Sequence, residues 1–168
     1  MRRLVLAVTA AALAIGMVAG PVAARTAPPA NIVDIAVAAS KATPGEFKTL
    51  VAAVLAADPA VVATLSKQRQ LTVFAPTDAA FAKLGLDAGN VDTLPKAKLT
   101  QILLYHVAPG ARYAEDVVSS SKIRTLERGF LKVSIRGGAA YVNDSKIIAT
   151  DIKATNGVIH VIDAVLMP

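Results

Sequence analysis

Two histidines, His106 and His160, are the only imidazole groups of this chain, which contains no cysteine. Imidazole acts as a general base or binds a metal only when partner residues are suitably arranged around it. The sequence has no Gly-X-Ser-X-Gly elbow, no histidine pair at helical spacing, no acid-rich calcium loop and no glycine-rich phosphate loop. A serine hydrolase would need one histidine to meet a serine and a carboxylate in the fold. We therefore predict no enzyme, no metal site and no cofactor.

A cluster of basic residues offers a different chemistry, the binding of anions. Its members fall within one predicted hairpin, with Glu127 as the only acid among them: Lys122, Arg124, Arg128, Lys132 and Arg136. Alternation along a strand would place several of them on one exposed face, which suits phosphate, sulfate or uronate groups. The alternative is that the charges keep a strand edge soluble. On the first interpretation, the partners are an acidic polysaccharide or an anionic membrane surface.

An apolar ligand is the alternative to surface binding. A space between helices and sheet would suit a lipid or a haem-like compound, with Tyr105, His106 and Met167 as its contacts. The histidines also have structural interpretations, because His106 follows a helix and His160 lies inside an apolar strand, where a hydrogen-bonded core histidine is typical. The chain has four Phe, three Tyr and no Trp, so we expect no nucleic-acid partner.

The N-terminus indicates export. Arg2 and Arg3 precede an apolar stretch, Leu4 to Val18, which is shorter than the roughly 20 residues of a membrane-spanning helix and ends in small residues. We predict a signal peptide over residues 1–24, cleaved after Ala24, and a flexible Pro-rich leader over residues 25–30. The protein is then secreted or periplasmic. Without cysteine, the rest must fold as one domain, residues 31–168, held by its core, and we expect a monomer.

Helix signals dominate the first half of this domain. We predict a helix after Asn31, a second capped by Thr43 with Pro44 in its first turn, and a third beginning at Asp58. Two further helices are predicted after Thr77 and from Pro95 to about His106.

Strand signals occur once between these helices and again after them. Leu71 to Ala75 reads as a short strand that ends at Pro76, and from Asp116 onward the apolar period becomes two, most clearly over residues 131–136. Turns are predicted at residues 129, 137–138, 143–144 and 156–157, and residues 158–162 read as a buried strand. Helices first and antiparallel strands later predict an α+β domain.

Three segments resemble the signature motifs of the fasciclin domain: LTVFAPTDAAF at 71–81, LLYHVAPG at 103–110 and NGVIHVIDAVLMP at 156–168. The resemblance implies a fasciclin-like domain over residues 31–168, an antiparallel β-wedge or sandwich flanked by N-terminal and central helices. It also implies a role outside the cell in adhesion or matrix contact. We interpret the polar motif residues as structural: Thr77, Asp78, Tyr105, His106, Asn156, Gly157 and His160.

The pair Asp151-Ile152 matches an Asp-Ile pair that belongs to an integrin-contacting motif in animal adhesion members of this family. Here Thr150 and Lys153 stand where the motif has proline and methionine. The alternative is a loop acid followed by a buried isoleucine. The function predicted from the sequence is a secreted, non-enzymatic adhesion or matrix-binding module that acts through its surface on an extracellular or cell-surface protein or an acidic polysaccharide. A small-ligand carrier is the alternative.

Overall fold

The computed structural model describes residues 30–42, 46–67 and 69–168. The predicted signal peptide, the predicted leader apart from Ala30, and the predicted cap at Thr43 and Pro44 lie outside the described residues. The helices are α1 (Ile32–Lys41), α2 (Lys48–Ala56), α3 (Pro59–Ser66), α4 (Asp78–Ala82), η1 (Val91–Thr93), α5 (Lys96–Tyr105) and α6 (Ala114–Ser119). The strands are β1 (Leu71–Pro76), β2 (Val107–Pro109), β3 (Lys122–Arg124), β4 (Phe130–Arg136), β5 (Ala139–Val142), β6 (Ser145–Ala154) and β7 (Gly157–Ile162).

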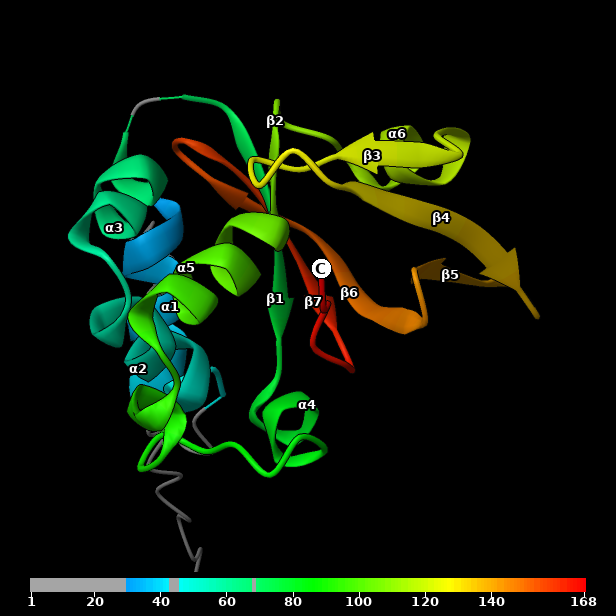
Figure 1. Ribbon diagram of the computed structural model, residues 1–168. Coiled ribbons are helices and arrows are strands. Elements are labelled where there is room, and N and C mark those ends of the chain that lie inside the picture. The colour runs from blue at the N-terminus through cyan, green and yellow to red at the C-terminus, as the bar shows by residue number, and fades with distance from the viewer. Residues whose placement is uncertain (1–29, 43–45, 68) are drawn as a thin grey trace, which may run out of the picture.

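The described strands form one seven-stranded sheet in the order β2-β1-β7-β6-β5-β4-β3. All neighbours are antiparallel except β1 and β7, which run parallel from Leu71 opposite Gly157 to Pro76 opposite Ile162. The predicted α+β class is confirmed, and the parallel pair adds a long-range contact that the sequence patterns did not indicate. Helices α1, α2, α3 and α5 gather beside β1 and β7, whereas the β4–β5 hairpin extends away from them (Figure 1).

Several helices begin where their capping residues predict. The side-chain oxygen of Asn31 accepts the backbone N–H groups of Val33 and Asp34 in the first turn of α1. In turn, the carboxylate of Asp34 accepts the backbone N–H of Asn31. Asp58 caps α3, which has Pro59 at its first position, and Thr77 caps α4. Local chemistry therefore sets these boundaries.

Two expectations were wrong. The second predicted helix, expected to have Pro44 in its first turn, begins only at Lys48 as α2, and Phe47 precedes it with a left-handed backbone (φ 66°). Residues 114–119 form helix α6, although the two-residue period was expected from Asp116 onward. The carboxylate of Asp116 accepts the backbone N–H of Tyr113 at 3.1 Å, so Asp116 marks the start of a helix rather than of a strand.

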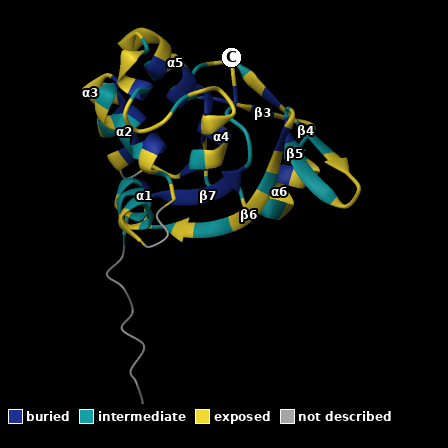
Figure 2. Cartoon of the chain, turned by 90° about the horizontal axis from the view of Figure 1, so that it is seen from below, coloured by how far each residue is buried: buried dark blue, intermediate teal, exposed yellow. Residues whose placement is uncertain are grey.

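The sheet separates two hydrophobic cores. Strands β1 and β7 are buried along their whole length, as predicted for residues 158–162, because both of their faces are covered. Helices α1, α2, α3 and α5 contribute to the first core, and β3, β4, β5 and α6 contribute to the second. Buried residues concentrate at β7 and the helices beside it, while the β4–β5 hairpin is mostly half-buried or exposed (Figure 2).

Among the described helices, none alone has the length and hydropathy needed to cross a membrane. Helices α2 and α3 reach that hydropathy only when taken together, and they meet at a bend of 117°.

Candidate functional site

Asp78 ties two helices together. It lies in the first turn of α4, and its carboxylate accepts the backbone N–H groups of Thr49 at 2.8 Å and Lys48 at 3.2 Å. These are the first residues of α2, which has no side-chain cap from its own N-terminus. Asp78 therefore pairs backbone donors of a helix that begins 30 residues earlier in the chain. Its carboxylate lies at the N-terminus of that helix, which is the positive end of the helix dipole.

His106 connects α5 to the C-terminal segment. Its Nδ1–H donates to the carbonyl of Ile102 at 2.8 Å, and its Nε2 accepts the backbone N–H of Leu166 at 2.9 Å. Burial lowers the pKa of His106 to about 4, so the imidazole is neutral at pH 7. Both ring nitrogens are engaged by the backbone, which leaves no lone pair to activate a nucleophile or bind a metal.

Tyr105 positions the start of β4. Its hydroxyl donates to the carbonyl of Phe130 at 3.1 Å and accepts from the side-chain amide of Asn143 at 3.4 Å. The ring lies so close to Gly129 that a Cβ there would approach Tyr105 Cε2 to 2.6 Å. The glycine of the predicted turn is therefore required by this aromatic contact.

Asn156, which we interpreted as structural and placed in a turn, is a buried junction. Its side-chain carbonyl accepts the N–H of Ile32, the first residue of α1, at 2.9 Å. Its amide donates to the carbonyls of Leu65 at 2.6 Å and Lys67 at 3.2 Å, at the end of α3. The next residue, Gly157, lies against the backbone of Leu71 in β1, where any Cβ would collide.

His160 and Asp151 form a second connection. The Nε2–H of His160 donates to the carbonyl of Arg112 at 2.8 Å, and its Nδ1 accepts the N–H of Asp151 at 3.4 Å. The imidazole packs on the ring of Phe74, with 5.6 Å between centroids, and burial lowers its pKa. His160 is thus a core residue bonded to backbone.

Asp151 lies at an irregularity of β6 with a left-handed backbone (φ 60°). Its carboxylate accepts the N–H of Ala114 at 2.8 Å and so caps α6. Ile152 is half-buried against the first core. Both residues have roles in the fold, and the integrin-like contact stays a prediction.

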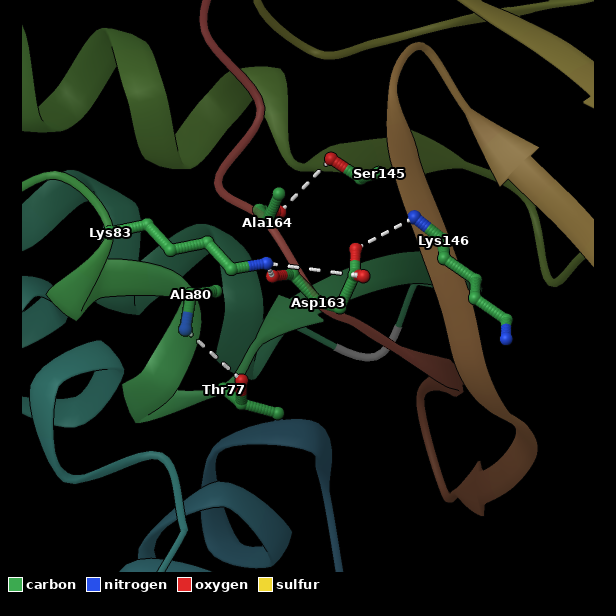
Figure 3. A network of polar contacts seen from close by, with 7 residues as sticks. All are labelled: Thr77, Ala80, Lys83, Ser145, Lys146, Asp163 and Ala164. Carbon is green, nitrogen blue, oxygen red and sulfur yellow. Dashed lines mark hydrogen bonds and ion pairs between the residues drawn. The ribbon is translucent and has the colours of Figure 1, made fainter.

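The closing segment is held by a network around Asp163 (Figure 3). The carboxylate of Asp163 accepts the backbone N–H of Lys146 at 2.8 Å, while its carbonyl accepts the ammonium of Lys83 at 2.7 Å. The Ser145 hydroxyl donates to the carbonyl of Ala164 at 3.1 Å. The C-terminal segment is therefore joined to both α4 and β6.

Four of the five predicted basic residues share one face of the β3–β4 pair. Strand register places Lys122 opposite Lys132 and Arg124 opposite Phe130, and alternation along β4 puts Arg136 on the same side. We call Lys122, Arg124, Lys132 and Arg136 the basic face. Arg128 is exposed in the loop before β4, where its backbone is left-handed (φ 78°).

The charges of the basic face are mostly uncompensated. Arg136 lies 3.5 Å from the carboxylate of Asp144 and stacks over the ring of Tyr141 at 5.2 Å. Within the described residues, no carboxylate lies within 4.0 Å of the cationic groups of Lys122, Arg124 or Lys132. Like charges directly opposite each other destabilise a strand pair, so this arrangement carries a cost that a bound anion would relieve.

A polar hollow of about 500 Å³ adjoins the basic face. Lys132 and Arg136 form one wall, the turn at residues 143–145 forms another, and residues 164–167 form the third. Phe130 lies on the basic face and is 58% exposed, which gives the face an apolar contact among its cations. The combination suits a partner that presents both anionic groups and C–H surface.

An apolar cavity of about 130 Å³ lies between helices α1–α3 and the sheet. Of the three residues predicted to contact a carried ligand, His106 lines this cavity and Tyr105 does not, whereas Met167 lines the polar hollow and a separate, mainly apolar hollow of about 260 Å³ beside α5. The haem-like compound does not fit, because the cavity is too small and both His106 nitrogens are occupied.

Reactive groups do not converge in the described parts of the chain. Neither histidine there hydrogen bonds to a hydroxyl or a carboxylate. Within those same ranges, no three His, Asp or Glu side chains lie close enough together to hold a metal ion.

Comparison with known proteins agrees with this architecture. A model of the fasciclin domain matches residues 45–168. The chain is 46% identical to protein sll1483 of Synechocystis sp. over 126 residues, 73% of this chain and 67% of that protein. It is 40% identical to protein sll1735 of the same organism over 139 residues, 82% of this chain and 97% of that protein.

Solved structures show the same fold. A FAS1 domain pair from the insect cell adhesion molecule fasciclin I matches with a TM-score of 0.66 at 20% identity, over 84% of this chain and 52% of that one. The family match spans most of the described residues and includes all three sequence motifs. The chain therefore belongs to the fasciclin domain family.

Proposed function

We propose that this protein is an extracytoplasmic adhesion module whose basic face binds an acidic polysaccharide. Fasciclin domains are in general adhesion-related, non-enzymatic extracellular modules. The observation that carries the proposal for this chain is the register of β3 and β4, which sets Lys122 directly opposite Lys132 with Arg124 and Arg136 on the same face. Only Arg136 has a carboxylate partner there among the described residues.

Anionic sugars match this face in charge and in shape. Uronate or sulfate groups repeat along a polymer, so several can meet successive cations of the two strands, and arginine can bind two oxygens of one such group through two parallel hydrogen bonds. The exposed ring of Phe130 contacts the C–H surface of a sugar, and the polar hollow admits a unit that projects from the polymer. Exposed ionic contacts are screened by salt, so binding weakens as ionic strength rises.

The predicted signal peptide, residues 1–24, supports a location outside the cytoplasm, either periplasmic or secreted. A single basic face on one chain is sufficient for the proposed contact, so the proposal requires no assembly beyond a monomer.

The decisive experiment compares residues 25–168 with two triple variants. The first replaces Arg124, Lys132 and Arg136 by Ala on the basic face. The second removes the same charge from exposed positions on helices, with Lys41, Lys96 and Lys98 replaced by Ala. Binding to polygalacturonate and to dextran sulfate, with neutral dextran as the blank, is measured from 20 mM to 500 mM NaCl.

We expect the basic-face variant to lose at least tenfold in affinity at low salt and the helix variant to stay within twofold of the unmodified protein. Equal losses of affinity in the two variants, or binding that does not change with salt, would contradict the proposal that the basic face binds the polymer. Capture of anionic phospholipid vesicles without capture of either polymer would contradict the polysaccharide and favour a membrane partner.

In cells, deletion of the gene should reduce attachment to surfaces or to neighbouring cells. Complementation with the helix variant should restore attachment, whereas the basic-face variant should not. Attachment that is unchanged by deletion in all growth conditions would contradict the proposal.

A further inference from the structure

We propose that the apolar cavity beneath α1 is a second binding site, which takes a small uncharged hydrocarbon group. The cavity is lined by α1, α2 and α3 on one side and by residues of β1, β7 and α5 on the other. It is separate from the basic face, which lies on β3 and β4, so the two sites can be tested independently.

The lining defines the chemistry of the ligand. Ile35, Leu50, Val54 and Leu65 are typical of the side chains around the cavity, and among the described residues that line it only His106 has a polar side chain. Both nitrogens of His106 are bonded to backbone groups, so the ring presents its carbon surface. A ligand with a charge or an unsatisfied hydroxyl would lose its hydration without compensation, whereas a hydrocarbon would regain contacts.

The size of the cavity sets an upper limit. A cavity of about 150 Å³ lined by aliphatic and aromatic side chains stays dry and admits benzene or xenon. The volume here, about 130 Å³, accommodates one unsaturated ring or a short branched alkyl group. Two sources supply that chemistry: a free small molecule, or the end of a longer hydrocarbon chain whose remainder leaves the cavity past α1.

Helix α1 is the part of the wall that can admit the ligand. Its N-terminus is fixed by the Asn31 cap and by the bond from Ile32 to Asn156. Ile32 is its only fully buried residue, and the side chains that line the cavity farther along, including Ala36 and Ala39, are only half-buried. The wall is thus one side chain thick there, and local displacement of α1 opens the cavity without unfolding the sheet.

Three single substitutions on α1 test the site. Ala36→Leu and Ala39→Leu each extend a side chain from the cavity wall, whereas Ala38→Leu adds the same atoms at an exposed position of the same helix that does not line the cavity. Each variant of residues 25–168 is titrated with benzene and, separately, with 1-decanol. Methyl chemical shifts of Ile35, Val54 and Leu65 are recorded by NMR, and the thermal midpoint is measured in parallel.

In the unmodified protein and in Ala38→Leu, we expect benzene to produce saturable shifts at these methyl groups and to raise the thermal midpoint. Ala36→Leu and Ala39→Leu should reduce the shift changes at least fivefold, and either variant suffices if the other does not fold. Saturable shifts with decanol as well identify a chain end as a ligand, and shifts with benzene alone identify a free small molecule. The proposal is overturned if neither probe gives saturable shifts in the unmodified protein, or if all three variants respond alike.

Discussion

The helix-covered half of the domain and the β3–β5 half are built differently. In the first, side chains distant in sequence bond to backbone groups of other elements, as Asp78 does to α2, His106 to Leu166 and Asn156 to α1 and α3. In the second, cations of the β3–β4 pair face solvent mostly without carboxylate partners among the described residues. The first half uses polar side chains to join elements that are distant in sequence, whereas the second half presents a group of cations to solvent.

This difference explains why the family motifs identify the fold. The basic face, from Lys122 to Arg136, lies between the motif at 103–110 and the motif at 156–168. The motif residues have their polar atoms bound inside the structure, so they identify the fold. The basic face lies in the segment between these motifs, where replacing Lys122, Arg124 or Lys132 breaks no ion pair among the described residues.

The sharpest test of the first half is Gly157→Ala. A Cβ at this position would collide with the backbone of Leu71, in the parallel pairing of β1 and β7, and neither strand can move without disturbing both cores. We expect a loss of about 4 kcal/mol or more in the free energy of unfolding, measured by urea denaturation, or no folded protein at all.

Gly137→Ala is its control. Gly137 lies in the β4–β5 turn with φ of 57°, and a Cβ there meets no atom within 4 Å. Only the backbone strain of about 1 kcal/mol is expected. Equal destabilisation by the two substitutions would contradict the contrast between the halves.

The next largest expected effect is a loss of stability at low pH, which arises from His106 in the first half of the domain. The folded pKa of His106, about 4, lies below its usual value of 6.5, so the unfolded chain takes up a proton first as the pH falls. The stability contributed by neutral His106 is therefore complete above pH 6.5 and is lost between pH 6.5 and 4, by about 3 kcal/mol in total. His160, whose pKa is also lowered, adds a loss of the same sign.

Urea denaturation at pH 7.5 and pH 4.5 measures this loss in the unmodified protein and in His106→Gln. The variant should be less stable at pH 7.5 and should lose less stability on acidification, because carboxylate contributions are common to both proteins. An identical pH dependence in the two would show that protonation of His106 does not oppose folding.

Smaller effects are expected at the two aspartates that cap helices of other segments. Asp78→Ala leaves two N–H groups of α2 unpaired, and Asp151→Ala leaves that of Ala114 unpaired, so each should cost about 1 to 2 kcal/mol in denaturation experiments. Asp151→Asn keeps an acceptor oxygen and tolerates the left-handed backbone, so its stability should be nearly unchanged. If Asp151→Asn nevertheless abolishes attachment to cells, the carboxylate contacts a partner in addition to capping α6.

The smallest expected effect has the opposite sign. Lys122→Glu replaces a like-charged cross-strand pair with Lys132 by an opposite-charged pair, which should stabilise the domain by about 0.5 kcal/mol. The same change should weaken binding to acidic polymer, whereas Lys96→Glu on α5 should do neither. A variant that becomes more stable and binds the polymer as before would contradict the division of roles between the halves.

Local chemistry made much of the fold predictable. Helices capped by Asn31, Asp58 and Thr77, the strand at 131–136 and the turns at 137–138 and 143–144 are specified by residues within a few positions of each other. The placement of four basic residues on one face follows from the period of two in β3 and β4.

The features that were missed depend on residues far apart. Asp78 caps a helix that begins 30 positions earlier, and Asn156 joins segments that are more than 80 positions away. A hydrogen bond between positions so far apart leaves no periodic pattern in the sequence. The parallel pairing of β1 with β7 and the cavity beneath α1 likewise depend on how complete elements pack, so only the folded chain reveals them.

The position of β7 in the sheet determines when the chain can fold. It is the last of the described strands along the sequence, yet it lies between β1 and β6, and β1 has no partner on that side until residues 157–162 are present. Closing so long a loop is entropically costly, and contacts between remote segments form slowly. In a chain that emerges N-terminus first, the side of β1 that faces β7 therefore stays unpaired until residues 157–162 are available.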